Sequence, residues 1–406
     1  MKMTHFVHRY GAEIGGGAEG ACRMMAEHLA ARGHEITVVT TCAIDYHTWA
    51  DAYDPGTSVI NGVEVVRHRV DHARDMTAWT AFATSVLRQR HSIPLDQQRE
   101  FVARQGPAIA SYADVVDRHA GLTDIAIFHT YLYQTTTAGL ARARRICPTV
   151  LHPTAHHEDA FQLPIFDQVL RQADGYFFHT PEEANLVAAR LGGQPTTSAI
   201  IGLGTPEPAR VSDDQKTQFR TKFGLGDTPF FLVLGRVDPA KGVLEIVESF
   251  TGLKRIFPFD ARLVVVGEQP QEYPIDSDVV VTGFVSETEK NAALAAATAL
   301  VVPSYAESFS LVLLEAWAHG TPAIVQGACE VLAGQARRSG GAVTYTSARD
   351  LYALINRALT DQTWVNNLGN TGQRYGQTHY DWTSVIDQYE DLAARTIASR
   401  RRLNHR

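Results

Sequence analysis

Short apolar runs alternate with amphipathic segments through the first half of the chain. The runs have the length and composition of buried strands, and the segments between them have the pattern of helices. Residues 78–120 are polar and helical in pattern, with no strand signal. This alternation predicts a parallel β-sheet that is covered by helices on both faces. The strands predicted in this half are THFVHRY, EITVVTT, VEVVRHRV, IAIFHT, TVLHPT, GYFFHT and TSAIIGLG.

A turn-rich passage at Ile201–Asp214 interrupts this rhythm, and a second α/β pattern begins after it. From about residue 347 the chain reads as helices only. We therefore predict an α/β fold of two doubly wound, Rossmann-like domains facing across a cleft. The expected boundaries are residues 1–205 and 206–380, followed by a C-terminal segment, 381–406. Ligands of such sheets bind at the carboxyl ends of the strands.

Composition narrows the class of protein. The 406 residues are ample for two domains, and 45% hydrophobic with 20% charged residues is typical of a globular protein. A net charge of −7 argues against a general nucleic-acid binder. The four cysteines form no CxxC pair, which favours a reducing compartment. No apolar run approaches the roughly 18 residues of a membrane span, and the N-terminus lacks a signal-peptide pattern, so we expect a cytoplasmic protein.

The segment Pro303–Pro322 places two glutamates around the start of a predicted helix. Eight positions separate Glu307 from Glu315, which is roughly 12 Å along a helix at 1.5 Å per residue. That spacing exceeds the roughly 5–9.5 Å between paired catalytic carboxylates of glycosidases. We interpret the two as contacts to opposite ends of one long ligand, with the helix N-terminus between them suited to phosphate. The alternative is a solvated Glu307 and a salt-bridged Glu315.

Two further segments have the character of anion sites. Gly15–Gly17 follow the first strand, where glycine lets backbone N–H groups approach an anion, although the run lacks the GxGxxG spacing of a dinucleotide site. A tight turn is the alternative there. In LGRVDPAKG, Arg236 follows a buried strand and Lys241 precedes a helix. Two cations at strand ends suit a diphosphate and would stabilise it as a leaving group, unless both are simply solvated.

Histidines follow several predicted strands. His156 lies after one strand, and His129 and His179 end two others, so at least one is expected in the site. No His/Cys/Asp spacing suggests zinc, and no Gly-x-Ser-x-Gly suggests a hydrolase. Four arginines in the helical region between 78 and 120 form either a solvated face or a contact to an anionic acceptor or membrane surface. They are Arg88, Arg90, Arg99 and Arg104.

Taken in order, the motifs resemble those of the GT-B-fold retaining glycosyltransferases of family 4, also called glycosyltransferase group 1. The resemblance spans nearly the whole chain and rests on IGGGAEG, ARGHEITVVTT, LGRVDPAKG, VVVTGFVS and ESFSLVLLE followed by AWAHGTP. It implies that Glu315 holds the ribose of a nucleotide-diphosphate sugar and that Glu307 holds the sugar. The catalytic residues that it implies are Glu307, Arg236, Lys241 and His156. It also implies that the C-terminal helix, 381–406, crosses back and packs on the N-terminal domain.

The resemblance also implies a set of donor contacts. Gly283–Val285 would receive the base, the backbone of Gly16 and Gly17 would meet the diphosphate, and Val312 would lie near the distal phosphate. Ser308 and Ser310 replace glycines common in the family, which leaves the donor sugar open. The implied donor-binding residues are Gly16, Gly17, Gly235, Gly283, Phe284, Val285, Ser308, Phe309, Ser310, Leu311, Val312 and Glu315.

We therefore predict a cytoplasmic, hexosyltransferase-type enzyme that uses a nucleotide-sugar donor such as a UDP- or GDP-sugar. The family implies retention of configuration, no cofactor and no metal. The acceptor is a small molecule, a glycan or a lipid-linked compound, shaped by residues 43–120, and peripheral contact with the inner membrane face stays open. The alternatives are a sugar phosphorylase or epimerase on the same fold, or a non-catalytic nucleotide-sugar-binding subunit.

Overall fold

The computed structural model describes residues 1–205, 210–235, 241–267 and 277–404. The chain divides into two compact units. Unit 1 comprises residues 1–203 and 382–406, and unit 2 comprises residues 204–381. These divisions lie next to the boundaries expected at 205/206 and 380/381. Arg236, one of the predicted catalytic residues, lies outside the described residues.

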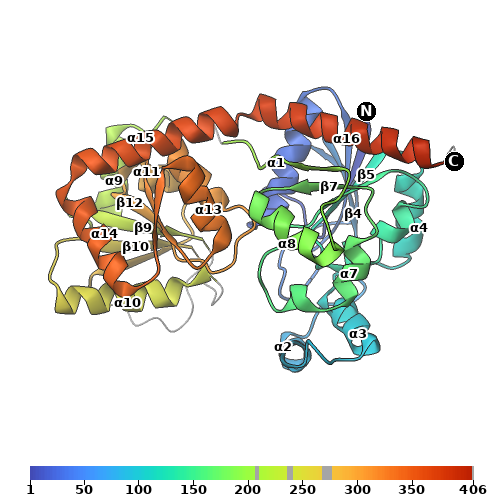
Figure 1. Ribbon diagram of the computed structural model, residues 1–406, viewed down its shortest axis with the longest axis horizontal. Helices are drawn as coiled ribbons and strands as arrows, with labels where there is room; N and C mark the ends of the chain where they lie inside the picture. Colours follow the sequence, from blue (N-terminus) through green and yellow to red (C-terminus); the bar gives the residue numbers. More distant parts are fainter. Residues whose placement is uncertain (206–209, 236–240, 268–276, 405–406) are drawn as a thin grey trace. The chain divides into compact units, whose positions relative to one another are not determined.

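Unit 1 contains an eight-stranded sheet in the order β3-β4-β2-β1-β5-β6-β7-β8 (Figure 1). All neighbouring strands run parallel except β3, which is antiparallel to β4. The strands are β1 Lys2–Phe6, β2 Glu35–Thr41, β3 Gly56–Ile60, β4 Val63–His68, β5 Ile125–His129, β6 Thr149–His152, β7 Gly175–Phe178 and β8 Ser198–Ile200.

The helices of unit 1 cover this sheet and carry local signals for their ends. In α8, Thr180 caps the first turn by accepting from the N–H of Glu183, and Pro181 occupies the first helical position, where its missing N–H costs nothing. The long C-terminal helix α16 packs on β7, β8 and α1. The helices are α1 Gly17–Ala31, α2 Met76–Arg88, α3 Leu95–Gln105, α4 Tyr112–Ala120, α5 Gln134–Thr137, α6 Leu140–Ala143, η1 Ala160–Gln162, α7 Ile165–Leu170, α8 Pro181–Leu191 and α16 Trp382–Asn404.

Unit 2 contains a six-stranded, all-parallel sheet in the order β11-β10-β9-β12-β13-β14. Its strands are β9 Phe230–Leu234, β10 Arg262–Val266, β11 Val279–Gly283, β12 Ala299–Val302, β13 Ala323–Gln326 and β14 Ala342–Tyr345. Its helices are α9 Asp213–Lys222, α10 Val243–Ile256, α11 Glu287–Ala296, α12 Leu311–Ala318, α13 Glu330–Ser339, α14 Ala348–Thr360 and α15 Gln362–His379. Capping boxes start α9 and α11.

The predicted fold class, two Rossmann-like domains with a parallel sheet in each, is confirmed. Two of the described strands, β3 and β14 Ala342–Tyr345, escaped prediction. Strand β3 is almost entirely exposed at the sheet edge, so it lacks the alternation of apolar and polar residues that marks a half-buried strand. Asn61 and Gly62 join it to β4 with φ values of 49° and 82°. An Asn-Gly pair with two positive φ angles is a strong hairpin signal, and it could have identified β3.

Candidate functional site

In unit 2 the predicted ligand segment runs from the carboxyl end of β12 into α12. Buried strand β12 ends at Val302, and α12 begins at Leu311. Helix α12 packs on its neighbours through its buried face, including Trp317, while Glu315 stays partly exposed on another face. The loop between strand and helix carries Glu307, whose side chain is 14% exposed. The topology therefore puts both glutamates at the edge of the sheet where parallel α/β folds bind ligands.

Glu307 forms an ion pair with Lys241. The ammonium Nζ of Lys241 donates to a carboxylate oxygen of Glu307 at 2.7 Å, and 28% of the lysine side chain is exposed. Gly242 makes this approach possible, because it adopts a φ of 65° and a Cβ there would overlap the backbone carbonyl of Pro303. Two segments of the prediction, the Lys241 turn and the Glu307 loop, thus meet in one place.

Glu315 is also paired, with a residue that sequence reasoning missed. Lys290 on α11 donates to Glu315 at 2.9 Å and contacts Glu287 at 2.8 Å. Burial acts to lower the pKa of Lys290, but the two carboxylates outweigh it and raise the pKa above its ordinary value. The salt-bridged alternative for Glu315 is therefore present in this structure, whereas Glu307 is paired rather than simply solvated.

The start of α12 offers backbone amides. Ser310, at the N-cap, has a φ of 78° in the left-handed region and makes no side-chain cap. Its hydroxyl is buried and has no hydrogen-bond partner among the residues that the structure describes. Ser310 makes no side-chain cap and the N–H of Leu313 donates to the Ser310 carbonyl at 3.2 Å, so the N–H groups of Leu311 and Val312 are the ones suited to meet an anion such as phosphate. Leu311 and Val312 are partly exposed.

The remaining residues of unit 2 that were predicted to bind the donor differ in their exposure to solvent. Gly235 directly follows β9 and donates its N–H to the carbonyl of Val266 at 3.0 Å. Gly283 ends β11, and Phe284 after it is 80% exposed, an unusual position for a large apolar ring. Phe309, by contrast, is 3% exposed and packs edge-on against Tyr380, so only its backbone is placed to meet a ligand.

In unit 1 the glycine loop leads directly into α1. Helix α1 begins at Gly17, and the backbones of Gly15 and Gly17 are exposed. A Cβ at Gly16 would overlap the carboxylate of Glu19, whereas one at Gly15 or Gly17 would meet open space. Glycine at position 16 is therefore required by the side chain that comes three residues later.

Glu19 anchors a buried polar group that the sequence did not suggest. Its carboxylate contacts His8 Nε2 at 2.8 Å and Arg9 Nε at 3.0 Å. As whole residues, all three are 7% exposed or less. Burial alone would raise the pKa of Glu19, but His8 and Arg9 hold it well below its ordinary range. Burial also lowers the pKa of His8, despite the opposing effect of Glu19.

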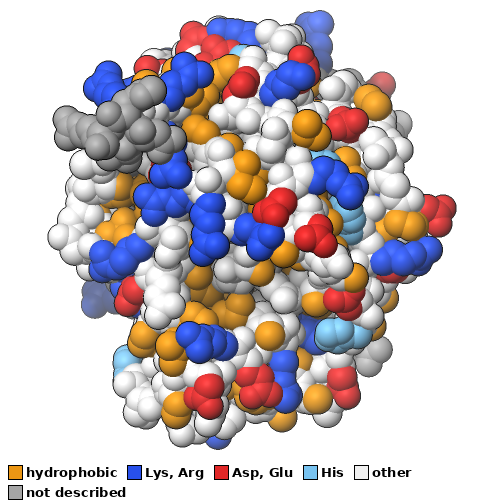
Figure 2. Space-filling model, turned by 90° about the vertical axis from the view of Figure 1, so that its right-hand side faces the viewer, with side chains coloured by type: hydrophobic (Ala, Val, Ile, Leu, Met, Phe, Trp, Pro, Cys, Tyr) orange, Lys and Arg blue, Asp and Glu red, His pale blue; other side chains and the backbone are white. Residues whose placement is uncertain are grey.

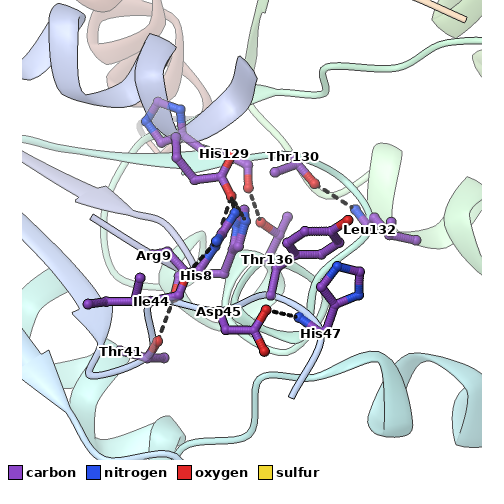
Figure 3. Close-up of polar contacts among 12 residues, drawn as sticks. His8, Arg9, Thr41, Ile44, Asp45, His47, His129, Thr130, Leu132 and Thr136 are labelled. Carbon is purple, nitrogen blue, oxygen red and sulfur yellow. Dashed lines mark hydrogen bonds and ion pairs between the residues drawn. The ribbon is translucent and has the colours of Figure 1, made fainter. Parts of the chain in front are cut away.

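Loops from neighbouring strands surround this group. Figure 3 shows His8 and Arg9 between the loop after β2 and the segment after β5. Arg9 donates to the carbonyl of Ile44 at 2.5 Å, and the ring of Tyr133 lies 3.8 Å from that of His8. The group follows the carboxyl end of β1, so it lies at the ligand-binding edge of the first sheet. An acidic residue in the first turn of α1, after a His-Arg pair, is the signal that could have revealed it.

The three predicted histidines take different positions. His156 is partly exposed, at 29% of its side chain, and its Nδ1 has no hydrogen-bond partner in the described part of the chain. Its Nε2 lies 3.7 Å from a carboxylate oxygen of Glu158. His129 and His179 are only 1% and 3% exposed and are packed inside unit 1. Burial lowers the pKa of His179 to about 3. Of the three, His156 is the one with access to a ligand.

The four arginines lie on α2 and α3 of unit 1 or in the turn after α2, and all are at least partly exposed. Arg90 donates to Gln162 at 2.9 Å and lies 3.4 Å from Asp159. Arg104 pairs with Glu100 one turn earlier on α3, and Arg88 and Arg99 are exposed. The pattern fits a solvated helix face. Within the described residues, no helix is both long enough and apolar enough to span a bilayer.

Comparisons with known proteins agree with this architecture. The family model for glycosyl transferases group 1 matches residues 215–375, and that for a glycosyl transferase 4-like domain matches residues 16–204. An uncharacterised glycosyltransferase of Methanocaldococcus jannaschii is 24% identical, and the match covers 96% of each chain.

Two solved structures have similar folds at low sequence identity. A sucrose-phosphate synthase from Thermosynechococcus elongatus superposes with a TM-score of 0.75 at 20% identity, covering 98% of this chain and 99% of that one. The Anabaena protein HepE, in complex with UDP and glucose, gives a TM-score of 0.72 at 15% identity and covers 97% and 99%.

Proposed function

Because the chain belongs to the group 1 glycosyltransferases of the GT-B fold, we propose that it transfers a sugar from a nucleotide-diphosphate donor to an acceptor hydroxyl with retention of anomeric configuration. The acceptor is a small molecule, a glycan or a lipid-linked compound, and the reaction proceeds without a metal ion. The location is cytoplasmic, in keeping with four free, buried cysteines.

The observation that carries this proposal is the pair of partly exposed ion pairs flanking the uncapped start of α12. Lys241–Glu307 and Lys290–Glu315 each contain a carboxylate that can exchange its lysine for sugar or ribose hydroxyls. In sequence, the start of α12 and its N–H groups lie between Glu307 and Glu315. A ligand with hydroxyls at both ends and an anion in the middle is what a nucleotide-diphosphate sugar presents.

The chemistry follows from the charges. The bond between the anomeric carbon and the diphosphate oxygen breaks, and the electron pair leaves with the diphosphate. The acceptor oxygen forms the new bond to that carbon, and its proton passes to the departing diphosphate. Lys241 and the N-terminus of α12 stabilise the negative charge on the departing diphosphate, and Glu307 orients the sugar. Since HepE is bound to UDP and glucose, UDP-glucose is the first donor to try.

A peripheral membrane contact is a separate part of the proposal. Figure 2 shows Lys and Arg side chains gathered on the face that carries the C-terminal end of the chain. The end of α16 lies beside α6, since Arg400 donates to the carbonyl of Arg144 at 2.7 Å. Arg145, Arg401 and Arg402 are exposed there. Co-sedimentation with anionic but not zwitterionic vesicles would support this contact. Failure to bind either kind of vesicle would refute it.

The decisive experiment screens nucleotide diphosphates and their sugars by thermal shift, since ligands that bind the folded state raise the melting temperature. The best donor is then incubated with acceptor pools in the presence of EDTA. We expect nucleoside diphosphate release that depends on acceptor, and a product whose anomeric proton coupling by NMR matches that of the donor.

Each alternative has its own result in the same assay. Turnover that requires inorganic phosphate and releases no nucleotide identifies a phosphorylase, and conversion of the donor alone identifies an epimerase. Tight donor binding with no turnover on any acceptor identifies a binding subunit. Loss of activity in EDTA, restored by Mg²⁺ or Mn²⁺, would refute metal independence, and an inverted product would refute retention.

A further inference from the structure

Four histidines from successive strands meet in the interior of unit 1. They belong to β1, β5, β6 and the residue after β7, and each is 3% exposed or less; they are His5, His129, His152 and His179. Nδ1 of His5 and Nε2 of His129 share a hydrogen bond of 3.0 Å. The ring of His152 lies 4.5 Å from that of His129, and its Nε2 is 3.0 Å from the hydroxyl of Tyr389 on α16. Such a concentration of imidazoles in a core is costly to desolvate.

Helix α1 adds a thiol to this cluster. Cys22 is fully buried, and its sulfur and one ring nitrogen from each of His5 and His129 lie within 4.8 Å of one another. Zinc binds His nitrogen at about 2.0–2.1 Å and Cys sulfur at about 2.3 Å, so ligand atoms around one ion lie roughly 3.3–3.8 Å apart. The three side chains are therefore already near the separations that a shared ion needs.

The protonation of these groups suits metal binding. A neutral imidazole binds a metal through the lone pair of one ring nitrogen, and the hydrogen bond between His5 and His129 brings one nitrogen of each ring into the cluster. His5 Nε2 is buried without a hydrogen-bond partner among the described residues.

We propose that His5, Cys22 and His129 bind one thiophilic metal ion, Zn²⁺ or Cu⁺, that links β1 and β5 to α1. Two imidazoles and one thiolate are the ligands that such ions select. Cu⁺ accepts a three-coordinate set as it stands, whereas tetrahedral Zn²⁺ requires a fourth ligand. The site lies in the core and takes no part in sugar transfer, so the inference is independent of the proposed function.

The binding step balances in protons and charge. The Cys22 thiol gives up its proton to buffer as the sulfur bonds to the metal. The ring that carries the proton shared between His5 and His129 changes tautomer. Its proton moves to the other nitrogen of the same ring, so both nitrogens that face the ion are free to bind it. One proton is thus released for each ion bound, and metal affinity increases with pH.

Sequence spacing could not reveal this site. Zinc motifs are recognised from ligands a few residues apart, as in C-x₂-C, whereas residues 5, 22 and 129 come together only through the pairing of β1 with β5 and the packing of α1. The proposed transfer reaction uses no metal ion, so a structural ion in the core of unit 1 would be separate from it.

The test uses the full-length chain, stripped with a chelator and titrated with Co²⁺, Zn²⁺ or, under reductant, Cu⁺. We expect one equivalent to bind, a thiolate-to-Co²⁺ charge-transfer band in the near ultraviolet, release of one proton and a higher melting temperature with metal. Cys22→Ala should abolish the charge-transfer band and weaken metal binding more than about 100-fold. Preference for Zn²⁺ or for Cu⁺ in competition with a chelator decides which ion the site takes.

A matched control separates this site from other thiols. Cys147→Ala removes another buried free cysteine of unit 1 that does not belong to the cluster of His5, Cys22 and His129. It should leave the charge-transfer band and the metal affinity unchanged. His129→Gln should weaken binding as Cys22→Ala does; if it fails to fold, Cys22→Ala decides alone. Failure of the wild-type protein to bind any of the three ions, or an unchanged band in Cys22→Ala, overturns the proposal.

Discussion

Each unit holds a glutamate paired with cations at the carboxyl edge of its sheet, but the two groups differ in their access to solvent. In unit 1, Glu19 is held by His8 and Arg9, and none of the three is more than 7% exposed. In unit 2, Glu307 and Lys241 keep 14% and 28% of their side chains exposed. A fully buried group is fixed in its contacts and shapes the loop above it, whereas a partly exposed pair can open to admit a ligand. The comparison therefore assigns structure to the first and ligand exchange to the second.

The largest effect should come from breaking the buried group. Glu19→Gln leaves Arg9 buried without a counter-charge, and removing one partner of a buried pair costs about 3–5 kcal/mol. We expect that loss in the free energy of unfolding, measured by guanidinium denaturation with far-UV circular dichroism. Glu13→Gln changes an exposed glutamate of the loop that precedes α1. It should lower the free energy of unfolding by less than about 0.5 kcal/mol. Equal stability of the two variants would contradict a structural role for Glu19.

Breaking the exposed pair of Lys241 and Glu307 should reduce activity strongly and stability only slightly. Lys241→Met and Glu307→Gln should lower kcat/KM for the donor by about 10²–10³-fold, because each removes a group that acts on the developing charge or on the sugar. Stability should fall by about 1 kcal/mol or less, since the remaining partner can be hydrated. The measurements are steady-state kinetics and denaturation on the same preparations.

The control for this pair is another lysine–glutamate contact of unit 2. Lys222→Met breaks the surface pair with Glu289 and should leave kcat/KM within about twofold. Full activity in both Lys241→Met and Glu307→Gln would refute the site assignment, and a large loss of stability in both would show that this pair, too, is structural.

The pH dependence of stability sharpens the contrast further. The pKa of His179 is about 3 in the folded state and about 6.5 when unfolded, so below pH 6.5 the unfolded state takes up the proton first. This group should therefore remove about 2 kcal/mol of stability between pH 6.5 and pH 5. Burial raises the pKa of Glu183 to about 8, so its contribution to stability decreases as the pH rises from 4.5 to 8. This dependence is opposite in sign to that of His179.

The informative quantity is therefore a difference between two proteins. Subtracting the pH profile of His179→Gln from that of the wild type cancels the contribution of Glu183 and isolates that of His179. A difference that stays flat from pH 7 to pH 5 would mean that His179 is not held neutral by burial. Urea denaturation at several pH values gives both profiles.

The same contrast explains what sequence could and could not predict. Glu307, Glu315 and the start of α12 lie within one local segment, and their placement follows from the order of strand, turn and helix. The partner of Glu315 did not follow, since Lys290 lies 25 residues away on α11. Glu19 with Arg9, and Cys22 with His129, depend on which elements pack together. Local periodicity carries no information on such pairings.

The smallest predicted effect tests the loop that positions the exposed pair. Ser310 has a φ of 78°, a region that costs a non-glycine residue about 1–3 kcal/mol. Ser310→Gly should raise the free energy of unfolding by about 1 kcal/mol, because relief of strain exceeds the greater entropy of the unfolded chain. Ser308 has no positive φ, so Ser308→Gly gains nothing and should lose about 0.5–1 kcal/mol. If both variants lose stability, the Ser310 conformation is not strained, and its buried hydroxyl must instead have a stabilising role at the start of α12.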